Sequence, residues 1–577
     1  TDTAKLWSWF GGVDKATRRE LTQTLTVDRP LALVAKFYDP EGTEKLVAYV
    51  SPTGAGNKDG YDAGNANDSI ADAVSLVSVE NAAGGEVRFV AGTYNISETL
   101  PLRQNLSYVG ATDGESVLDG AKLNKIVCFD GSSAGDVAGG ALENLVLSNC
   151  TAGCVSFAAN SGDFTVTGCR FTAGKYGIAA SSDDDSRLFV SNCAFVGLST
   201  SVDRAAGVNV SKALVPTLVD CLFKGNTGSP NGNSASLGFT YYPNVSGKVA
   251  VLRQCRFEDN RSLDCCNGAI VHYSDGVSSG LRLYGCTFLR NSCTMRPGAE
   301  TNGQRSPCLS VRKPGSGVYV FDSYFGYNTL TNTATAQDPK IGSVIASNTA
   351  DGKFLFFNCT FEHNSLRTVK SSGNAGTIQL GWQKQVGIAH CVFNENDVFH
   401  VNATTGADER IGELQVGSGS FATGLFDSIF THSAEDYAYC ASDSAPSRQY
   451  WVTMNCNIKN YTTPSAKGWK AHWVNITTDD QPKLDKLRDN GSGLLARGVA
   501  SDSPFRKCGS VWRVANTGMP YLYSKSGFGT LSKNTWMPLT PSDSVITDEA
   551  AADLELTTQT SPMDDALSDS KSATFAL

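Results

Sequence analysis

The sequence lacks the features that mark several large classes of protein. No apolar run approaches the roughly 18 residues that a membrane-spanning helix needs, and residues 1–5 do not begin a charged-then-apolar signal pattern. Basic residues form no run and number 48, against 57 acidic ones. The net charge of -9 therefore argues against a nucleic-acid partner.

Signatures of common active sites are also missing. The sequence contains no nucleophile elbow, no phosphate-binding loop and no zinc-ligand spacing. Cys265 and Cys266 are adjacent, which is a poor arrangement for a pair of zinc ligands, and no second pair follows at a metal-binding spacing. We therefore predict no catalytic residue and no cofactor from motifs alone.

What the sequence does contain is a repeated phrase, Cys-x-Phe-x-x-Asn. Complete copies begin at Cys221, Cys255, Cys286, Cys359 and Cys391, and weaker ones at Cys169, Cys193, Ser323 and Ser428. Successive copies from residue 169 onward lie 24 to 37 residues apart, a period typical of stacked repeats. The repeat predicts a solenoid, which can grow in one direction to 577 residues around one continuous core.

The repeat also predicts the role of most of the 17 cysteines. Side chains alternate across a strand, so the Cys and Phe of each copy share one face, and we expect them to form buried columns. Ser at positions 323 and 428 supports this interpretation, because a disulfide would not tolerate the exchange. The Asn is expected to bond along the column at a turn. A strand-like segment before Cys150 is expected to lead into the same column. Pairing stays open for the cysteines outside it: Cys128, Cys154, Cys265, Cys266, Cys293, Cys308, Cys440 and Cys508.

The N-terminal part of the chain has a different pattern. Segments 21–27 and 31–37 are predicted strands, separated by Asp28-Arg29-Pro30, and residues 1–46 are interpreted as the end of a small β repeat domain. This ending resembles the last strands of the internalin-type B repeat of bacterial surface proteins. Residues 68–77 have apolar residues at helical spacing behind a polar cap, so they predict a helix that covers the first β rung.

The features that follow have a recognisable order. Tyr49-Val50-Ser51-Pro52-x-Gly54, the cap helix, Gly92-x-Tyr94 and Leu106-x-Tyr108-Val109-Gly110 resemble the opening of right-handed parallel β-helix proteins of the pectate-lyase-like superfamily. The expected fold is all-β: a right-handed parallel β-helix solenoid with an N-terminal helical cap and a small N-terminal β segment. We expect the β-helix over residues 47–480, an aromatic-rich C-terminal cap over 481–541, and a tail or linker over 542–577.

The repeat itself carries a second resemblance. Phe-x-x-Asn together with Gly268-Ala269-Ile270 is similar to the paired motifs of the chlamydial-type polymorphic outer membrane proteins, which are bacterial surface β-helices implicated in adhesion. This resemblance implies a surface β-helix.

Two clusters deserve a test as sites of chemistry. Polysaccharide lyases need a base beside carboxylates that hold Ca²⁺, and Asp183, Asp184 and Asp185 form the best acidic cluster, with Arg187 nearby. A solvated loop is the alternative interpretation. The stretch from His272 to Asp275 has the most catalytic residue types, but no second carboxylate can be placed opposite it. The Asp-Asp, Gly-His-Gly and Arg-Ile-Lys set expected of polygalacturonase-like hydrolases is missing.

These observations favour a secreted bacterial cell-surface protein with a structural or adhesive task. It would self-associate, with filaments as one form, or bind a cell-surface or glycan partner. The alternative is a polysaccharide lyase or glycoside hydrolase that acts in a groove on one face of the β-helix. Ca²⁺ at Asp183–Asp185 is the only metal that the sequence suggests, and the long loops and the C-terminal tail are the expected places for binding.

Overall fold

A computed structural model describes much of the chain up to residue 454 and a set of strands beyond it. The described residues are 4–11, 13–23, 32–123, 126–131, 137–158, 162–183, 186–200, 205–228, 235–241, 248–264, 268–274, 280–297, 304–312, 317–334, 340–347, 353–369, 375–380, 385–389, 391–402, 404–410, 414–416, 422–426, 429–431, 440–441, 450–454, 511–514, 520–524, 535–538, 546–547 and 556–557. The chain divides into two compact units: residues 1–200 with 206–226, and residues 201–205 with 227–577.

The first unit opens with a two-stranded antiparallel ribbon. It pairs β1 (Lys5–Phe10) with β2 (Val34–Tyr38). The predicted strand 31–37 overlaps β2, but residues 21–23 form a turn, and the rest of the predicted strand 21–27 lies outside the described residues. Strand β1 was not predicted from the sequence. It is fixed by tertiary packing, because Trp7 and Phe10 are buried and the Trp7 Nε1 donates to the Leu76 carbonyl at 2.8 Å.

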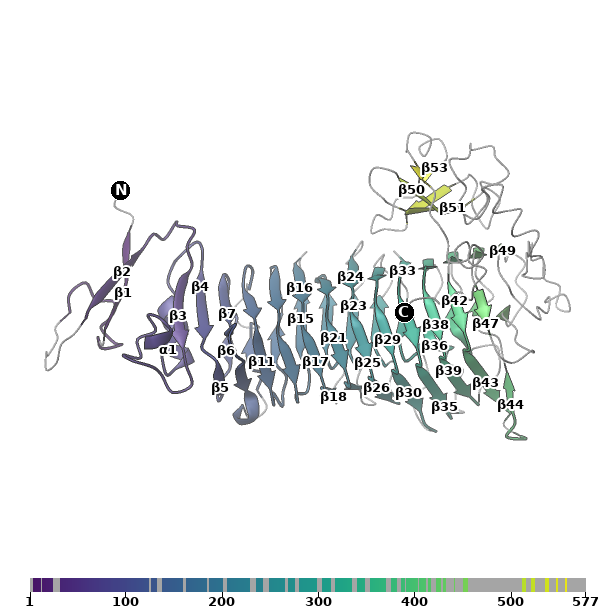
Figure 1. The fold of residues 1–577 in the computed structure, drawn as a ribbon, viewed down its shortest axis with the longest axis horizontal. Helices are drawn as coiled ribbons and strands as arrows, with labels where there is room; N and C mark the ends of the chain where they lie inside the picture. Colours follow the sequence, from purple (N-terminus) through teal and green to yellow (C-terminus); the bar gives the residue numbers. More distant parts are fainter. Residues whose placement is uncertain are drawn as a thin grey trace. The chain divides into compact units, whose positions relative to one another are not determined.

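The cap helix is present where the sequence predicts it. Helix α1 (Ile70–Val77) begins after Ser69, whose Oγ accepts the Asp72 N–H at 3.3 Å. Its buried residues are Ala73, Val74, Leu76 and Val77. The helix packs on β3 (Leu46–Val50) and β4 (Gly85–Phe89), as Figure 1 shows. It therefore covers an edge of the first rung that would otherwise be open to pairing.

Beyond the cap, the first unit is built from rungs of short parallel strands on three faces. The faces are numbered one to four in the order in which the chain passes through them in each rung of the second unit. Most strands of the third face are given with that unit. The first face holds β3, β4, β7 (Leu106–Val109), β10 (Ala141–Glu143), β13 (Phe164–Thr167), β16 (Arg187–Ser191) and β20 (Val215–Val219). The second holds β5 (Gly92–Asn95), β8 (Ser116–Asp119), β11 (Leu145–Ser148), β14 (Arg170–Thr172), β17 (Ala194–Val196) and β21 (Leu222–Lys224). The fourth holds β6 (Leu100–Pro101), β9 (Phe129–Asp130), β12 (Val155–Phe157), β15 (Ile178–Ser182) and β19 (Val208–Lys212). Three short elements complete the unit: β18 (Ser199–Thr200), which is the first strand of the third face, η1 (Ala63–Asn65) and η2 (Gly120–Lys122).

The second unit has strands on all four faces. Its first face holds β24 (Val249–Arg253), β28 (Gly280–Tyr284), β33 (Gly317–Phe321), β37 (Lys353–Phe357), β41 (Gln385–Ala389), β46 (Ala422–Phe426) and β49 (Tyr450–Met454). Its second face holds β25 (Arg256–Glu258), β29 (Thr287–Leu289), β34 (Tyr324–Gly326), β38 (Thr360–Glu362), β42 (Val392–Asn394) and β47 (Ile429–Thr431). The third holds β22 (Thr227–Gly228), β26 (Arg261–Leu263), β30 (Ser292–Met295), β35 (Thr329–Asn332), β39 (Ser365–Thr368), β43 (Asp397–Val401) and β44 (Asp408–Arg410). The fourth holds β23 (Leu237–Tyr241), β27 (Ile270–Ser274), β32 (Leu309–Arg312), β36 (Lys340–Ser347), β40 (Ala375–Leu380), β45 (Leu414–Val416) and β48 (Cys440–Ala441), with β31 (Gln304–Arg305) paired to β36.

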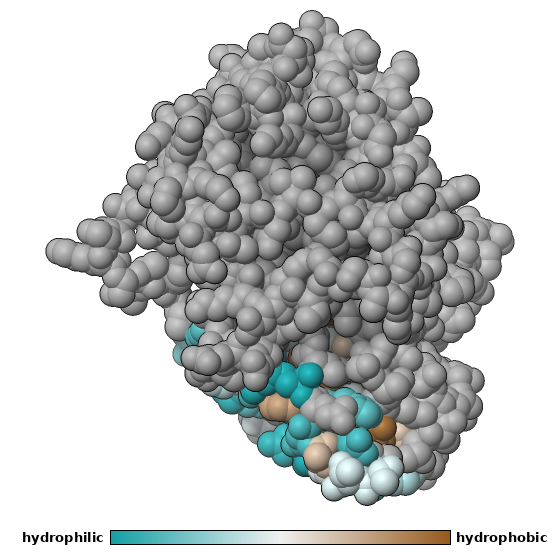
Figure 2. Space-filling view, turned by 90° about the vertical axis from the view of Figure 1, so that its right-hand side faces the viewer, coloured by the Kyte–Doolittle hydropathy of each residue, from teal (hydrophilic) through white to brown (hydrophobic). Residues whose placement is uncertain are grey.

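Two parts of the second unit depart from parallel pairing. Strand β44 pairs antiparallel with β43 and ends the third face. Arg410 bonds Asp397 at 2.9 Å and Arg367 bonds Asp408 at 3.0 Å, so charged side chains surround this edge. Figure 2, seen from the side where β43 and β44 lie in Figure 1, is mostly hydrophilic over the part it colours. The last five strands, β50 (Val511–Val514), β51 (Pro520–Ser524), β52 (Thr535–Pro538), β53 (Ile546–Thr547) and β54 (Leu556–Thr557), form a separate antiparallel sheet.

The predicted Cys and Phe columns are confirmed. In the second unit the ring centroids of Phe257, Phe288, Phe325, Phe361 and Phe393 lie 4.5 to 5.2 Å apart in near-parallel planes. All twelve described cysteines are buried thiols, including four that lie outside the column: Cys128, Cys154, Cys293 and Cys308. Cys265, Cys266 and Cys508, and the side chain of Cys440, lie outside what the structure describes.

One member of the predicted column is wrong. The strand register pairs Glu143 with Thr167 and Val146 with Arg170, so Leu145 stands at the position of Cys169. Leu145 and Leu147 fill the Cys and Phe places in this rung, and both are fully buried. Cys150 follows β11 at the next corner and does not belong to the column.

Candidate functional site

A ladder of asparagines fixes the corner between the second and third faces of the second unit. Asn260, Asn291, Asn328, Asn364 and Asn396 are fully buried, and each of the first four donates its Nδ2 to the Oδ1 of the next at 2.9 to 3.0 Å. The same Oδ1 atoms accept the backbone N–H of the preceding Asn at 3.0 to 3.2 Å. Because each buried amide is satisfied on both sides, the corner has one well-defined geometry. The predicted bonding of Asn along the column is confirmed.

The residue before each ladder Asn has left-handed backbone geometry. These residues are Asp259, Arg290, Tyr327, His363 and Glu395, with φ between +48° and +57°. They follow one another rung by rung outside the solenoid, and we call these five residues the corner row. Left-handed geometry suits Asn, Asp and His but costs other L-residues about 1–2 kcal/mol. Arg290, Tyr327 and Glu395 therefore occupy their positions against the preference of their own backbone.

Other corners show that this cost is avoidable. The corner between the first and second faces of the same unit has left-handed Gln254, Gly285, Asp322 and Asn358. In the first unit, the corner that follows the second face uses Asn149, Ala173, Gly197 and Gly225. Most of these residues are small or tolerate left-handed geometry. The corner row is different because successive rungs carry a charge or an aromatic ring, which is the pattern expected where strain is kept for function.

A groove of about 600 Å³ lies beside the corner row. Asp259, Arg290 and Tyr327 line it from the corner. The strands of the third face supply the other lining residues: Thr227, Arg261, Ser262, Leu263, Ser292, Thr294 and Thr329. Hydroxyl groups, two guanidinium groups, one carboxylate and one phenol ring therefore surround a single depression on a rigid sheet.

The groups around the groove are ordered by contacts between rungs. The Arg290 guanidinium bonds the Asp259 carboxylate through two contacts, at 2.8 and 3.1 Å, and this ion pair raises the pKa of Arg290. The Tyr327 and His363 rings lie 5.0 Å apart, and Tyr327 is 48% exposed. The exposed aromatic ring can contact the apolar face of a bound molecule, while the planar charged groups beside it bond the hydroxyl groups of the same molecule.

The second face adds a polar network next to the row. Glu362 accepts the Tyr324 hydroxyl at 2.8 Å and the Asn394 amide at 2.9 Å. Burial, and then the Glu362 carboxylate, raise the pKa of Tyr324, so this phenol stays protonated well above neutral pH. All three side chains are half-buried. Glu362 immediately precedes His363, a residue of the corner row.

The acidic cluster proposed for Ca²⁺ is only partly described. The Asp183 carboxylate is paired with Lys212 Nζ at 2.8 Å and is exposed, whereas Asp184 and Asp185 lie outside the described residues. Within the described part of the chain, no group of three or more His, Cys, Asp or Glu side chains is arranged to hold a metal ion. Calcium at this cluster therefore stays a prediction.

The second predicted cluster does not join the groove. His272 lies in β27, where the register pairs it with Phe239 and Val311, two fully buried residues of the fourth face. Asp275 lies outside the described residues. The corner row was not predicted from the sequence, because the motif Phe-x-x-Asn allows any residue at its third position. The signal was there: that position reads Asp, Arg, Tyr, His and Glu in successive copies.

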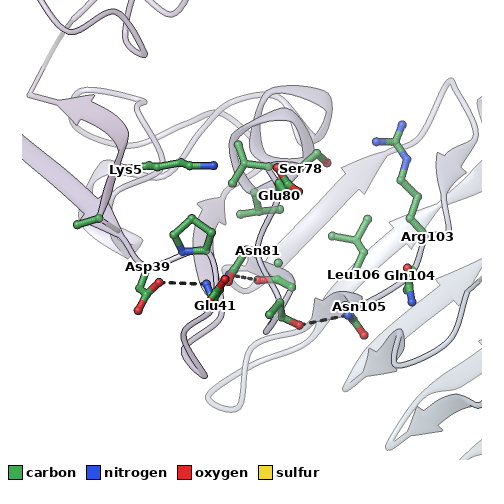
Figure 3. Close-up of a pocket in the computed structure, with 17 residues that line it drawn as sticks. Lys5, Asp39, Glu41, Ser78, Glu80, Asn81, Arg103, Gln104, Asn105 and Leu106 are labelled. Atoms are coloured by element: carbon green, nitrogen blue, oxygen red, sulfur yellow. Dashed lines mark hydrogen bonds between the residues drawn. The ribbon is translucent and has the colours of Figure 1, made fainter. Parts of the chain in front are cut away.

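A larger cavity, of about 920 Å³, lies in the first unit beside the cap helix. Figure 3 shows Lys5 and Arg103 on opposite sides of it, with Asn81 and Asn105 between them. The two asparagine amides donate to the backbone carbonyls of Gly84 at 2.9 Å and Ala82 at 3.3 Å. These contacts hold the loops of the cap in place, so the cavity has a sufficient structural explanation.

Comparison with known proteins identifies the solenoid. Residues 126–393 match the family model described as a right handed beta helix region. The chain contains a right-handed parallel β-helix. The fold expected from the opening motifs is therefore confirmed, while the likeness of the repeat to the chlamydial-type surface proteins stays a resemblance. No curated protein sequence matches the chain.

Solved structures of β-helix proteins with several different roles share this fold. Pectate lyase Pel9A is 12% identical over 58% of this chain and 79% of its own, with a TM-score of 0.36. Bacteriophage CBA120 tailspike protein 3 is 13% identical over 82% and 67%, with a TM-score of 0.34. PfbA, a surface adhesin of Streptococcus pneumoniae, is 11% identical over 65% and 92%, with a TM-score of 0.27. Similarity at this level concerns the fold alone. Among the described residues, no helix is long and apolar enough to cross a membrane.

Proposed function

We propose that the chain is an extracellular adhesive β-helix protein of the bacterial surface that binds a glycan along the corner row and the groove of the third face. The observation that carries this proposal is the corner row itself. Three of its residues, Arg290, Tyr327 and Glu395, keep left-handed geometry where glycine would be more stable. The exposed Arg290–Asp259 ion pair offsets only part of this strain, whereas a binding surface gains its contact groups from the same residues.

The chemistry of the groove fits a saccharide. Sugars offer hydroxyl groups to planar charged side chains and C–H faces to aromatic rings, and the groove provides Arg290 with Asp259 and an exposed Tyr327. Ser292 and Thr329 add hydroxyl groups from the third face. Successive rungs lie about 4.8 Å apart. The corner row therefore repeats at a regular distance along the solenoid and can contact successive units of a polymer.

The test separates binding from stability. Tyr327→Gly and Arg290→Gly relieve the left-handed strain, so the free energy of unfolding should stay the same or rise by up to about 1 kcal/mol. Glycan binding to the full chain, measured on an array and then by calorimetry, should fall at least tenfold. Asp322→Gly is the matched control, since Asp322 is a left-handed exposed residue at the other corner. Unchanged glycan binding in the Tyr327 and Arg290 variants would show that the row is not a binding surface.

The alternative is a polysaccharide lyase or glycoside hydrolase, and the network around Glu362 is the observation that favours it. A half-buried carboxylate held by Tyr324 and Asn394 beside His363 has residue types that could move a proton. It ranks second because glycosidases need two carboxylates across a substrate, whereas Asp259, the carboxylate among the described lining residues of the groove, is in an ion pair with Arg290. Release of reducing ends or unsaturated products from a panel of polysaccharides, with and without Ca²⁺, and its loss in Glu362→Gln, would establish this alternative.

Self-association into filaments is a separate part of the proposal. The charged side chains around β44, the edge strand of the third face, disfavour growth by strand addition there. Filaments would have to use another surface. Sedimentation of the purified chain at increasing concentration tests this directly, and a monomer at all concentrations would remove self-association from the proposal.

A further inference from the structure

The outward side of the first face changes character within the solenoid. In the first unit, β16 exposes Arg187 and Phe189, and the Phe189 side chain is 41% accessible. In the second unit the outward positions of β28, β33 and β37 are filled by Arg282, Tyr319 and Leu355, which are at most 1% accessible. Their strand neighbours Leu281, Val318 and Phe354 fill the solenoid interior. Both sides of this sheet are therefore buried, although one of them points away from the core.

This outward side is an organised apolar surface. Tyr284 and Phe321 stack at 5.1 Å, and Phe321 lies 6.3 Å from Phe357. The Arg282 guanidinium lies 3.8 Å from the Tyr319 ring centre and donates to the Gly317 carbonyl at 2.9 Å. We call Arg282, Tyr284, Tyr319, Phe321, Leu355 and Phe357 the aromatic face. Outward side chains as inaccessible as Tyr319 and Leu355 are covered by another stretch of polypeptide, because the strands of one sheet do not bury their own outward side.

We propose that the aromatic face is the docking surface for the C-terminal part of this chain, residues 457–577, and specifically for its antiparallel sheet β50–β54. The site is separate from the glycan groove, so the two proposals stand or fall independently. The sequence predicts that an aromatic-rich C-terminal cap covers the end of the solenoid. We propose instead that this part of the chain packs against the side of the first face.

Three observations point to this occupant. First, β49 is the last strand of the first face and lies four strands from β33, about 19 Å at the usual strand spacing. Residues 455–510 separate β49 from β50, far more chain than this distance requires. The C-terminal sheet is therefore tethered to a strand of this face by a segment long enough to reach the aromatic face.

The second observation is composition. The register of the C-terminal sheet pairs Trp512 with Tyr521 and Tyr523 with Trp536, so aromatic residues occupy paired positions in three of its strands. A five-stranded sheet of such short strands cannot bury an aromatic set by itself and needs a second layer. The aromatic face supplies a layer of matching character.

The third observation is charge. Residues 542–577 contain eight Asp and Glu but a single Lys. The first face offers Arg282 within the aromatic face and an exposed Arg253 at its margin, where its guanidinium lies 4.6 Å from the Tyr284 ring centre. An acidic segment is therefore attracted to this side of the solenoid.

The decisive experiment compares two aromatic residues of the same face in the full chain. Phe321→Asp places a charge in the aromatic face, and Phe189→Asp places one at an outward position that is already exposed. Hydrogen exchange of peptides within 511–557 should become about tenfold to a hundredfold faster in Phe321→Asp, the factor that corresponds to the burial of one Phe side chain, and should not change in Phe189→Asp. Exchange of β42 reports whether the solenoid remains folded.

A photo-reactive residue gives an independent measurement. Benzoylphenylalanine in place of Phe321 should cross-link within the same molecule to residues 457–577. Unchanged exchange of 511–557 in a folded Phe321→Asp variant would overturn the proposal. Cross-links to a second copy, with a dimer that Phe321→Asp dissociates, would also overturn it and assign the face to self-association.

Discussion

Removing one rung of the asparagine ladder should destabilise the β-helix strongly and locally. The Asn328 side chain makes four buried hydrogen bonds. Its Oδ1 accepts the N–H and the Nδ2 of Asn291, both at 3.0 Å, and its Nδ2 donates to the Phe288 carbonyl and to Asn364 Oδ1, both at 2.9 Å. Asn328→Ala deletes all four and leaves the buried Asn291 N–H without this acceptor.

The size of the effect follows from the count of bonds. A buried hydrogen bond contributes about 1 kcal/mol, and a buried donor left without a partner costs about 1–3 kcal/mol more. We expect Asn328→Ala to lower the local stability by about 4 kcal/mol. Solenoid rungs can open without global unfolding, so the assay should be local hydrogen exchange rather than a single denaturation midpoint. Exchange of the Asn291 amide should rise by about a thousandfold, with no change in β10 and β11.

Two variants separate the hydrogen bonds from other effects. Asn328→Leu restores the lost volume but none of the bonds, so it should be as unstable as Asn328→Ala. Asn358→Gly removes a single exposed bond, to Asp322 Oδ1 at 2.7 Å, at a left-handed position that suits glycine, and should change stability by at most about 0.5 kcal/mol. A loss below about 1.5 kcal/mol in Asn328→Ala, or recovery in Asn328→Leu, would refute the reasoning.

Further predictions concern the column, the phenol and the cap. Cys359→Ser should cost about 1 kcal/mol or less by denaturation, because Ser323, at the equivalent place, already donates to the carbonyl two residues before it, at 2.7 Å. The raised pKa of Tyr324 means that the folded protein holds this proton more tightly than the unfolded chain does. Its contribution to stability should therefore be complete below about pH 10 and fall as the pH rises further, and Tyr324→Phe should reduce this fall in a pH series of unfolding free energies. Ser69→Ala should destabilise α1 by about 1 kcal/mol, measured as faster exchange in residues 70–77.

The sequence predicts the interior of this molecule better than its surface. Alternation places Cys and Phe of each copy on one face, and stacking then follows from the repeat period, so the columns and the helix at 70–77 are predictable from local pattern alone. Cys150 shows the limit of that reasoning. The strand-like segment before it suggests a column member, but the register gives the column position to Leu145, an apolar residue that fills this position without matching the motif.

Features that depend on tertiary contacts were beyond sequence reasoning. Strand β1 has no distinctive pattern and forms because Trp7 finds a carbonyl at the end of α1. The corner row has a visible sequence signal, but its meaning depends on backbone geometry, since an ordinary φ at Tyr327 would leave an unremarkable surface residue. Acidic and histidine residue types favour Asp183 and His272 instead, but Asp183 follows β15 and His272 lies in β27, both strands of the fourth face.

The ladder and the corner row depend on each other. Each buried Asn needs the residue before it to turn the chain with positive φ, so the ladder sets the geometry that the row must accept. Each rung adds three ladder bonds, and at about 1 kcal/mol each they exceed the strain of about 1–2 kcal/mol for one left-handed Arg or Tyr. The corner can therefore carry Arg290 and Tyr327 on its surface and keep its backbone geometry. A change of glycan specificity is then expected to alter the exposed row while the buried asparagines stay fixed, because only the row is free to vary without opening the solenoid.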